Sequence, residues 1–363
     1  MSTTEGRVLL LHTGGTIGMR HTDHGYEPAP GYLASRLASL PAFQDPDLLG
    51  EPVTAPSRFG KRVRYEVQEQ EPLLDSANMS VGEWVRIART IEARYAEFDA
   101  FVVLHGTDTM AYTAAALSFM LDGLSKTVIL TGSQIPLSRV RNDAVDNLLG
   151  AVLFAGHYEL PEVGIYFKDK LLRGNRARKV DAAGLDAFRS SNFPPLVQIG
   201  VETDVRWDLV RPVEREGLLV RPITSDHVAA LRLFPSISWQ TLQRFLQPPL
   251  EGLVLETYGA GNAPDNRPHF LDVLAEATER GVVIVNCTQC QTGMVTADYA
   301  AGRALARAGA VPGADMTAEA ALVKLQWLLS QDLPASEVRR LMSENLRGEL
   351  TPLQGPTRFS WRS

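Results

Sequence analysis

Short apolar runs alternate with helix-like segments along the first two-thirds of the chain. Most of these runs are rich in β-branched residues, which is typical of strands buried on both faces. Residues 63–67 instead alternate between apolar and polar positions, as a strand with one exposed face does. The predicted strands are residues 7–12, 63–67, 100–104, 127–130 and 163–167. The predicted helices are residues 80–95, 110–121 and 142–155, the first opening on the capping-box pair Ser80 and Glu83.

Strands that alternate with helices predict a mostly parallel sheet with helices on both faces. The regularity fades after residue 195, and residues from about 205 to 225 mix charge, proline and short apolar pieces. A second alternating series follows. Its strands are residues 228–233, 252–256 and 282–286, and its helices are residues 268–280, 317–329 and 336–346.

A chain of 363 residues is long for one hydrophobic core. We therefore predict two α/β domains. The larger N-terminal domain spans residues 1–208 and has a mostly parallel sheet flanked by helices. A linker covers residues 209–226, and a smaller C-terminal α/β domain covers residues 227–363.

Composition narrows the class of protein. Hydrophobic residues make up 45% of the chain and charged residues 21%, which is ordinary for a globular protein. We expect no membrane segment, because no apolar run approaches the roughly 20 residues that cross a bilayer, and no signal-peptide pattern is present. The net charge of −6 and the lack of a basic stripe argue against nucleic acid as a partner. With only two cysteines, Cys287 and Cys290, we expect a cytoplasmic protein without a disulfide framework.

Two threonine-bearing loops follow predicted strands. Residues 13–18 read Thr-Gly-Gly-Thr-Ile-Gly, and residues 105–109 read His-Gly-Thr-Asp-Thr. Ligands of open α/β sheets bind at the carboxyl ends of strands, and a threonine hydroxyl becomes a nucleophile when a partner activates it. The first loop lacks the spacing of a dinucleotide site or a P-loop. Each loop alone also fits a plain turn, and Asp108 alone fits an N-cap for the next helix.

Other candidates have equally plain alternatives. On charge alone, Lys179 belongs to a solvated basic loop, residues 173–179. Lys179 is a catalytic candidate only if the fold buries it beside a hydroxyl, since a desolvated lysine has a lowered pKa and can take a proton from threonine. Tyr26 fits a surface loop or a flexible loop over Thr16. The Cys287–Cys290 pair has no second pair to complete a zinc site, and the histidines show no ligand spacing, so we expect neither metal nor cofactor.

Together these motifs resemble the asparaginase/glutaminase family, specifically its type I, cytoplasmic, bacterial-type L-asparaginases. The resemblance covers nearly the whole chain and rests on the order of separated motifs. The motifs are residues 13–19, residues 104–110, residues 173–176 leading to Lys179, residues 258–264 (Tyr-Gly-Ala-Gly-Asn-Ala-Pro) and residues 345–352 (Asn-Leu-Arg-Gly-Glu-Leu-Thr-Pro).

The resemblance implies roles for particular residues. Thr16 would be the nucleophile that attacks the side-chain amide, and Tyr26, on a mobile lid, would help to activate it. Thr107, Asp108 and Lys179 would form a second, linked triad. The acyl-enzyme would then be hydrolysed to release the product, with no cofactor.

The same resemblance implies substrate contacts. Asp75 and Ser76 would grip the α-carboxylate and amine of L-asparagine, and Thr107 and Asp108 would help to bind it, Asp108 facing the α-ammonium. Asn262 matches a residue that approaches the site from a neighbouring subunit, so the resemblance implies a homodimer or homotetramer.

One position departs from the family pattern. Type I members can carry an effector asparagine site in the C-terminal domain. Glu256 stands where the bacterial allosteric pattern has arginine, while Thr288 and Cys290 on its other side are retained. An acidic side chain does not attract the effector's carboxylate, so we expect weak or absent activation by asparagine.

The sequence therefore predicts an L-asparaginase that makes aspartate and ammonia. Glutamine is a second possible substrate, because one methylene group gives only about 1–3 kcal/mol of discrimination. An amidotransferase subunit shares the fold but would need a partner chain. The alternative from another class is a non-catalytic amino-acid-binding protein, which we would expect to have lost Thr16, Thr107 or Lys179.

Overall fold

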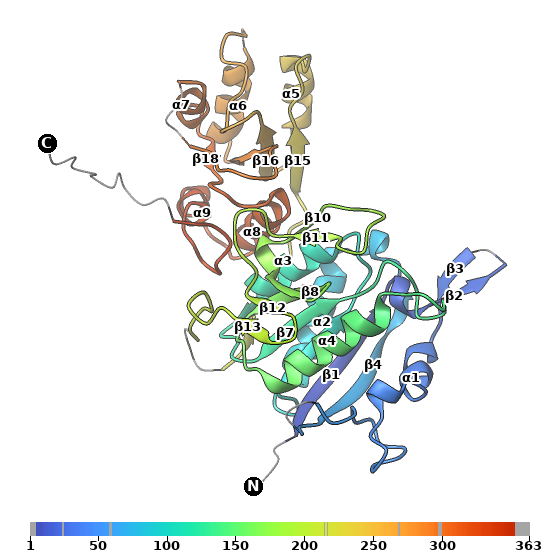
Figure 1. Ribbon diagram of the computed structural model, residues 1–363. Helices are drawn as coiled ribbons and strands as arrows, with labels where there is room; N and C mark the ends of the chain where they lie inside the picture. The colour runs from blue at the N-terminus through green and yellow to red at the C-terminus, as the bar shows by residue number, and fades with distance from the viewer. Residues whose placement is uncertain are drawn as a thin grey trace, which may run out of the picture. The chain divides into compact units, whose positions relative to one another are not determined.

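The computed structural model describes residues 5–352, except residues 24, 58–59, 214, 216, 268 and 297–299. The chain folds as two units, Met1–Thr224 and Ser225–Ser363. The predicted pair of α/β folds is confirmed, since each unit has its own mostly parallel sheet (Figure 1).

The first unit is built on an eight-stranded mixed sheet. Five strands, in the order β8, β7, β5, β1 and β4, run parallel to one another. The remaining three join as antiparallel neighbours at the β8 edge. In sheet order the strands are β13 (Thr203–Val205), β12 (Val197–Ile199), β9 (Lys170–Arg173), β8 (Val163–Phe167), β7 (Thr127–Thr131), β5 (Ala100–Leu104), β1 (Gly6–Gly14) and β4 (Val63–Leu74).

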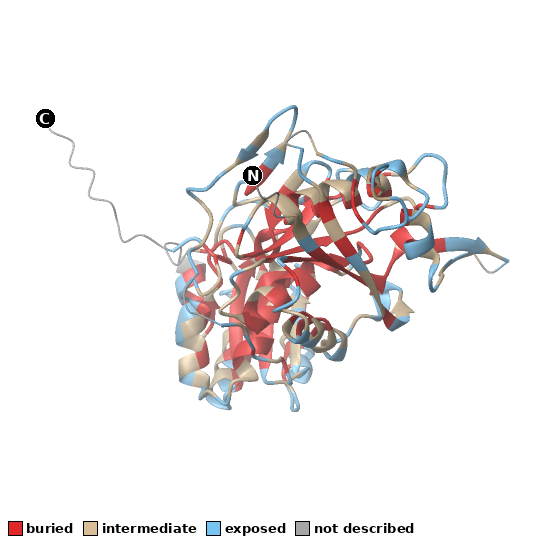
Figure 2. Ribbon diagram, turned by 90° about the horizontal axis from the view of Figure 1, so that it is seen from below, coloured by how far each residue is buried: buried red, intermediate tan, exposed pale blue. Residues whose placement is uncertain are grey.

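Helices cover both faces of this sheet (Figure 1). On one face, α1 (Tyr32–Leu37) and α4 (Ala144–His157) pack with alternate side chains of the central strands, such as Val8 and Leu10, into one fully buried cluster. On the other, α2 (Val81–Ala93) and α3 (Met110–Met120) pack against each other, and α3 contacts β8. The central strands β5, β7 and β8 are buried at every position, as their unbroken apolar runs predict (Figure 2).

The second unit has a four-stranded parallel sheet in the order β15 (Val228–Arg232), β16 (Gly252–Thr257), β17 (Val283–Thr288) and β18 (Val311–Pro312). Its helices are α5 (Trp239–Phe245), α6 (Phe270–Glu279), α7 (Ala300–Arg307), α8 (Ala318–Leu329) and α9 (Ala335–Met342). Buried apolar side chains from α5, α6 and the strands form one hydrophobic cluster. Helices α8 and α9 also contact strands of this sheet.

Several local details differ from the sequence predictions. Ser80 is the N-cap of α2, but its side chain makes no capping hydrogen bond. Glu83 instead forms an ion pair with Arg86 one turn along the helix, so the capping box is wrong. The predicted linker contains β14 (Leu219–Val220), which pairs with β6 (Leu121–Asp122). Each of these strands has only two residues, which is too short for a hydrophobic periodicity to predict it.

The basic segment 173–179 is not the solvated loop that its charge predicts. Arg173 and Arg176 are buried, and Arg173 donates to both carboxylate oxygens of Glu162, at 2.6 and 2.9 Å. The ring of Phe193 lies under both guanidinium groups. A paired and stacked arginine can be buried at little net cost, so the segment packs between α3 and β8 as the short helix η4 (Gly174–Arg176).

The motif at residues 345–352 wraps a buried charge in the second unit. Glu349 and Lys324 of α8 are fully buried, with Nζ 2.6 Å from the carboxylate. Lys324 also donates to the carbonyl oxygens of Met342 and Glu344, and Glu349 accepts from the amides of Leu346 and Arg347. Burial alone would raise the pKa of Glu349, but Lys324 and these two amides outweigh it and hold that pKa below its ordinary value.

We expect Lys324→Met to leave the Glu349 carboxylate buried without a counter-charge. Breaking a buried pair in this way costs about 3–5 kcal/mol of unfolding free energy. Urea unfolding monitored by circular dichroism should show a lower midpoint for the variant. The double variant Lys324→Met/Glu349→Gln should recover part of that loss, and equal midpoints for single and double variants would contradict this account.

Candidate functional site

The candidate residues of the first unit lie at the carboxyl ends of four neighbouring parallel strands. Residues 13–18 begin in the last two residues of β1 and continue beyond it, residues 105–109 follow β5, Asp75 and Ser76 follow β4, and Gln134 follows β7. The register aligns these ends, since Gly14 pairs with Leu74, and Leu104 pairs with both His12 and Thr131. Side chains far apart in the sequence therefore meet at one edge of the sheet.

Glycines allow these loops to pack backbone against backbone. Gly15 has φ of 80°, and a methyl group added to it would lie 2.3 Å from the nitrogen of Gly106. A methyl group on Gly106 would lie 2.4 Å from Oγ of Ser76. Thr16 and Thr107 are the next residues after Gly15 and Gly106. Their loops are therefore in direct contact, and both contacts require glycine.

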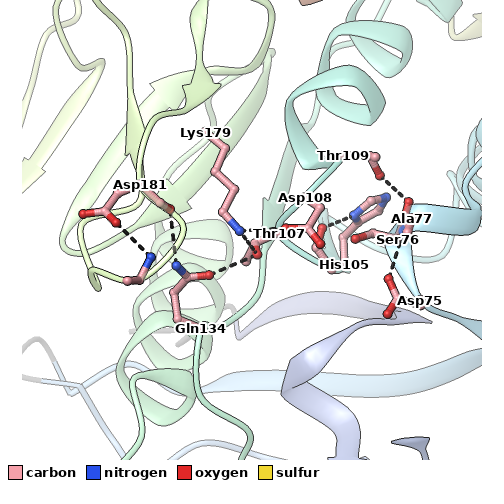
Figure 3. Close-up of polar contacts among 12 residues, drawn as sticks. Asp75, Ser76, Ala77, His105, Thr107, Asp108, Thr109, Gln134, Lys179 and Asp181 are labelled. Carbon is pink, nitrogen blue, oxygen red and sulfur yellow. Dashed lines mark hydrogen bonds and ion pairs between the residues drawn. The ribbon is translucent and has the colours of Figure 1, made fainter. Parts of the chain in front are cut away.

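Lys179 joins Thr107 and Asp108 into a polar cluster (Figure 3). Its Nζ donates to Thr107 Oγ1 and to Asp108 Oδ1, each at 2.8 Å. Lys179 lies on β10 (Arg178–Lys179), which pairs with β11 (Phe188–Arg189), and 17% of its side chain is exposed. The N-cap of α3 is Thr109, not Asp108. The capping alternative for Asp108 is therefore wrong, and its carboxylate contacts lysine instead.

Thr16, Ser76 and Asp108 have unused polar atoms. Thr16 opens the short helix η1 (Thr16–Gly18), and Ser76 opens η3 (Ser76–Asn78), where it is 2% exposed. Within the described part of the chain, the hydroxyls of Thr16 and Ser76 make no hydrogen bond, and the carboxylate of Asp108 bonds only to Lys179. Groups of this kind are available to a ligand.

Asp75 caps the short helix η3 in this structure. Its side chain is exposed and accepts a hydrogen bond from the amide of Ala77 at 2.9 Å, which caps η3. Thr109 also supports this turn, because its hydroxyl donates to the carbonyl oxygen of Ser76 at 2.8 Å. Both contacts fix the position of Ser76 relative to the Thr107 loop (Figure 3).

Tyr26 lies on a hairpin beside the sheet, and its hydroxyl makes no hydrogen bond to a described residue, which an interaction with Thr16 would need. The hairpin consists of β2 (Met19–Thr22) and β3 (Gly25–Pro28) and extends away from the sheet (Figure 1). The tyrosine is 38% exposed, its ring packs edge-on against His21, and the Arg139 guanidinium lies 6.0 Å from its centre. No hydrogen bond between the described residues joins Tyr26 to Thr16.

Asn262 lies in the second unit, in a turn after β16 where Tyr258 and Asn262 form an isolated bridge. The predicted effector segments meet at one end of the smaller sheet, because Glu256 pairs with Cys287, and Gln289 donates to the carbonyl oxygen of Glu256. Burial raises the pKa of the Cys287 thiol to about 12, so this thiol stays protonated, whereas Cys290 is exposed.

The sequence analysis assigned no role to two supporting residues, Gln134 and His105. Gln134 accepts a hydrogen bond from Thr107 at 3.1 Å. His105 is fully buried, with Nδ1 2.6 Å from the carbonyl oxygen of Gly106 and Nε2 2.8 Å from Thr113 Oγ1. Since the carbonyl can only accept, Nδ1 carries the proton and Nε2 accepts from Thr113. Position at a strand end, the signal used for Thr107, could have found Gln134.

Comparison with known proteins identifies the family. A model of the asparaginase N-terminal domain matches residues 7–211, and a model of the glutaminase/asparaginase C-terminal domain matches residues 227–342. The chain belongs to the asparaginase family. The type I resemblance is confirmed by L-asparaginase 1 of Escherichia coli K12, which is 46% identical over 95% of this chain and 98% of its own length.

Two further family relatives are similar over most of this chain. The human 60 kDa lysophospholipase is 48% identical over 96% of the chain, which spans 62% of that protein's length. The crystal structure of L-asparaginase I from Vibrio cholerae superimposes with a TM-score of 0.85 at 43% identity, covering 96% of this chain and all of that one. The asparaginase fold therefore accounts for both units.

Three further observations concern possible metal sites, membrane spans and pockets. No group of three or more His, Cys, Asp or Glu in the described part of the chain could hold a metal ion, and none of its helices is long and apolar enough to cross a membrane. An apolar pocket of about 400 Å³ lies along α4, beside Leu149, Phe154 and Tyr166. None of the candidate residues lines it.

We expect Gly15→Ala to separate the two loops. The added methyl group meets backbone atoms, so the loss of unfolding free energy should exceed that of Gly50→Ala by roughly 1–3 kcal/mol. Gly50 is a matched control, since its φ is 86° and nothing lies within 4 Å of an added methyl group. Equal losses in urea unfolding would show that the loops do not touch as described.

Burial lowers the pKa of His105 to about 4. An unfolded histidine titrates near pH 6.5, so the unfolded state takes up this proton first as the pH falls. The contribution of neutral His105 is complete above about pH 6.5 and is lost progressively down to about pH 4, by about 3 kcal/mol. Between pH 7 and pH 4.5, unfolding free energy should fall more steeply for the wild type than for His105→Gln. Parallel curves would refute this.

Proposed function

We propose that this protein is an L-asparaginase that hydrolyses L-asparagine to L-aspartate and ammonia through an acyl-enzyme on Thr16. The observation that carries the proposal is the Lys179–Thr107–Asp108 cluster, with both Nζ contacts at 2.8 Å, in a loop that touches the Thr16 loop. The names of the L-asparaginases from E. coli and V. cholerae support the same substrate.

The free groups match the ends of an amino acid. An α-amino acid presents a carboxylate that needs donors and an ammonium that needs an acceptor. The Ser76 hydroxyl is an available donor, and the half-used carboxylate of Asp108 is an available acceptor. Asp75 lies one residue before Ser76 and is exposed, so it is placed to add a second acceptor. These contacts would hold the side-chain amide of the substrate near the two threonines.

The chemistry then takes two steps. The Thr16 hydroxyl attacks the amide carbon, its proton passes to the leaving nitrogen, and the C–N bond breaks to release ammonia and leave a β-aspartyl ester on Thr16. Water next attacks the ester, and the proton returns to Thr16 as aspartate leaves. Each attack creates an oxyanion that preorganised donors stabilise, and backbone amides of the contacting loops would supply such donors. Thr107 and Lys179 would carry protons between water and the leaving groups.

Activation of Thr16 needs a further group, since its hydroxyl has no partner among the described residues. We propose that the β2–β3 hairpin closes over the substrate and brings Tyr26 to Thr16. The exposure of Tyr26 and its loose contact with Arg139 at 6.0 Å support a hairpin that can move. Closing would also exclude water from the first step.

Three wider expectations belong to the same proposal. Asn262 would complete the site of a neighbouring subunit, which requires a homodimer or homotetramer. Both cysteines are free thiols, which supports residence in a reducing compartment such as the cytoplasm. The acidic Glu256 at the predicted effector site supports weak or absent activation by asparagine, and hence a hyperbolic rate curve.

The decisive measurement is ammonia release from L-asparagine and L-glutamine by the purified protein. We expect asparagine to be the better substrate, and Thr16→Ala to lower kcat by at least about a thousandfold, because the nucleophile is gone. Thr203→Ala, on the far edge strand β13, is the matched control and should keep wild-type turnover.

The other outcomes discriminate between functions. Fatty-acid release from lysophosphatidylcholine, without ammonia release, would favour the activity named for the human relative. Binding of asparagine by calorimetry without any turnover would favour a non-catalytic amino-acid-binding protein. Either result would overturn the asparaginase proposal.

A further inference from the structure

Gln134 is clamped between the Thr107 hydroxyl and a turn of the chain beyond β10 (Figure 3). Its Oε1 is 3.1 Å from Thr107 Oγ1. Its Nε2 is 3.1 Å from the carbonyl oxygen of Gly184 and 3.4 Å from that of Asp181. None of the roles assigned above to the triad or the substrate contacts includes this side chain.

The partners of Gln134 decide which way its amide faces. Carbonyl oxygens only accept hydrogen bonds, so the NH₂ group must face Asp181 and Gly184. The amide oxygen therefore faces Thr107, and Thr107 must donate its single proton to it. Lys179, a donor when charged, then takes one lone pair of Thr107 Oγ1. The carbonyl oxygens of the turn therefore decide which atom donates in each hydrogen bond from Gln134 through Thr107 to Lys179.

Contacts from the start of α4 fix the backbone around Gln134. The buried carboxylate of Asp143, at the start of α4, accepts from the amides of Gln134 and Ile135 at 3.0 and 2.9 Å. Asn147, one turn into the helix, donates to the carbonyl oxygen of Gly132 at 3.0 Å. The first turn of α4 thus holds the loop in place before any ligand binds.

The turn at the far end is equally ordered. The carboxylate of Asp181 accepts from the amides of Ala183 and Gly184, both at 2.8 Å. These two bonds lower the pKa of Asp181. The acceptors for the Gln134 NH₂ group therefore stand on a closed, hydrogen-bonded turn rather than on a loose loop.

We propose that Gln134 is a positioning residue that sets the direction of the Thr107 hydroxyl. With its proton on Gln134 and one lone pair on Lys179, the hydroxyl keeps its second lone pair for a water that donates a proton. Without Gln134 the hydroxyl can rotate and present its proton to that water instead. The catalytic consequence rests on the proposed function, but the coupling between Thr107 and the turn does not.

Two substitutions distinguish an effect on the direction of the Thr107 hydroxyl from an effect on the turn that Gln134 contacts. Gln134→Met keeps the length of the side chain but removes both ends of the clamp. Gln134→Glu keeps an acceptor for Thr107 but loses the donor to the turn. We expect Gln134→Met to lower kcat for asparagine about three- to tenfold, as loss of one hydrogen bond predicts, with KM within about twofold. Gln134→Glu should have a higher kcat than Gln134→Met.

Gln198→Met is the matched control, because Gln198 also donates to a backbone carbonyl, that of Asp169, but lies on β12. It should leave kcat and KM unchanged. Equal kcat losses in Gln134→Met and Gln134→Glu would show that Gln134 acts only by holding the turn, which would overturn the proposal. A wild-type kcat in Gln134→Met would overturn it as well.

Hydrogen exchange tests the coupling without any turnover. Thr107→Val removes the donor to Gln134, so amide exchange in a peptide covering residues 180–188 should become faster in this variant and in Gln134→Met, but not in Gln198→Met. Unchanged exchange in both variants would overturn the coupling. If the wild type released no ammonia, the asparaginase proposal would fail while the exchange data still decided the link between Thr107 and the turn.

Discussion

The contact between two glycine backbones is the constraint on which the candidate site depends. Gly15 and Gly106 lie in the loops that follow two neighbouring parallel strands, and neither has room for a side chain. Because the loops touch there, the next residue of each, Thr16 and Thr107, is brought to the same edge of the sheet. Ser76 lies against Gly106 in turn, so one line of close packing gathers residues from three strands.

Around this line, the site divides into a rigid side and an open side. Lys179 and Gln134 both bond to the Thr107 hydroxyl, and Asp143 at the start of α4 holds the backbone of Gln134. Thr16 and Ser76, by contrast, have hydroxyls without partners among the described residues. Fixed groups can stabilise charge without rearranging, whereas free groups can bind a ligand. This division fits an enzyme better than a protein that only binds an amino acid.

Much of this arrangement could be predicted from the sequence. Unbroken apolar runs placed β5 and β8 with their correct ends, because strands buried on both faces have no polar positions to confuse the pattern. Threonines directly after such runs pointed to Thr107, and the family resemblance pointed to Lys179, whose contacts with Thr107 and Asp108 the structure now provides. The roles assigned to these residues stay predictions.

The remaining features depend on partners that lie far away in the sequence. The buried Arg173 looked solvated because its partner Glu162 and the ring of Phe193 come from other segments. The β2–β3 hairpin has no apolar periodicity, since only one residue of its two strands is buried. The clamp on Gln134 requires two carbonyl oxygens, and every residue has a carbonyl oxygen, so no side-chain pattern could indicate it.

The exposed hairpin also separates two properties that are usually linked in a folded protein. Substitutions in a buried strand change stability and function together, because the same atoms serve both. Most residues of β2 and β3 are outside the core, so replacing them costs little folding free energy. The segment that carries Tyr26 can therefore accumulate changes while the sheet keeps its fold. On the proposed closure of this hairpin over the substrate, changes in substrate preference among related chains would carry little cost in folding free energy.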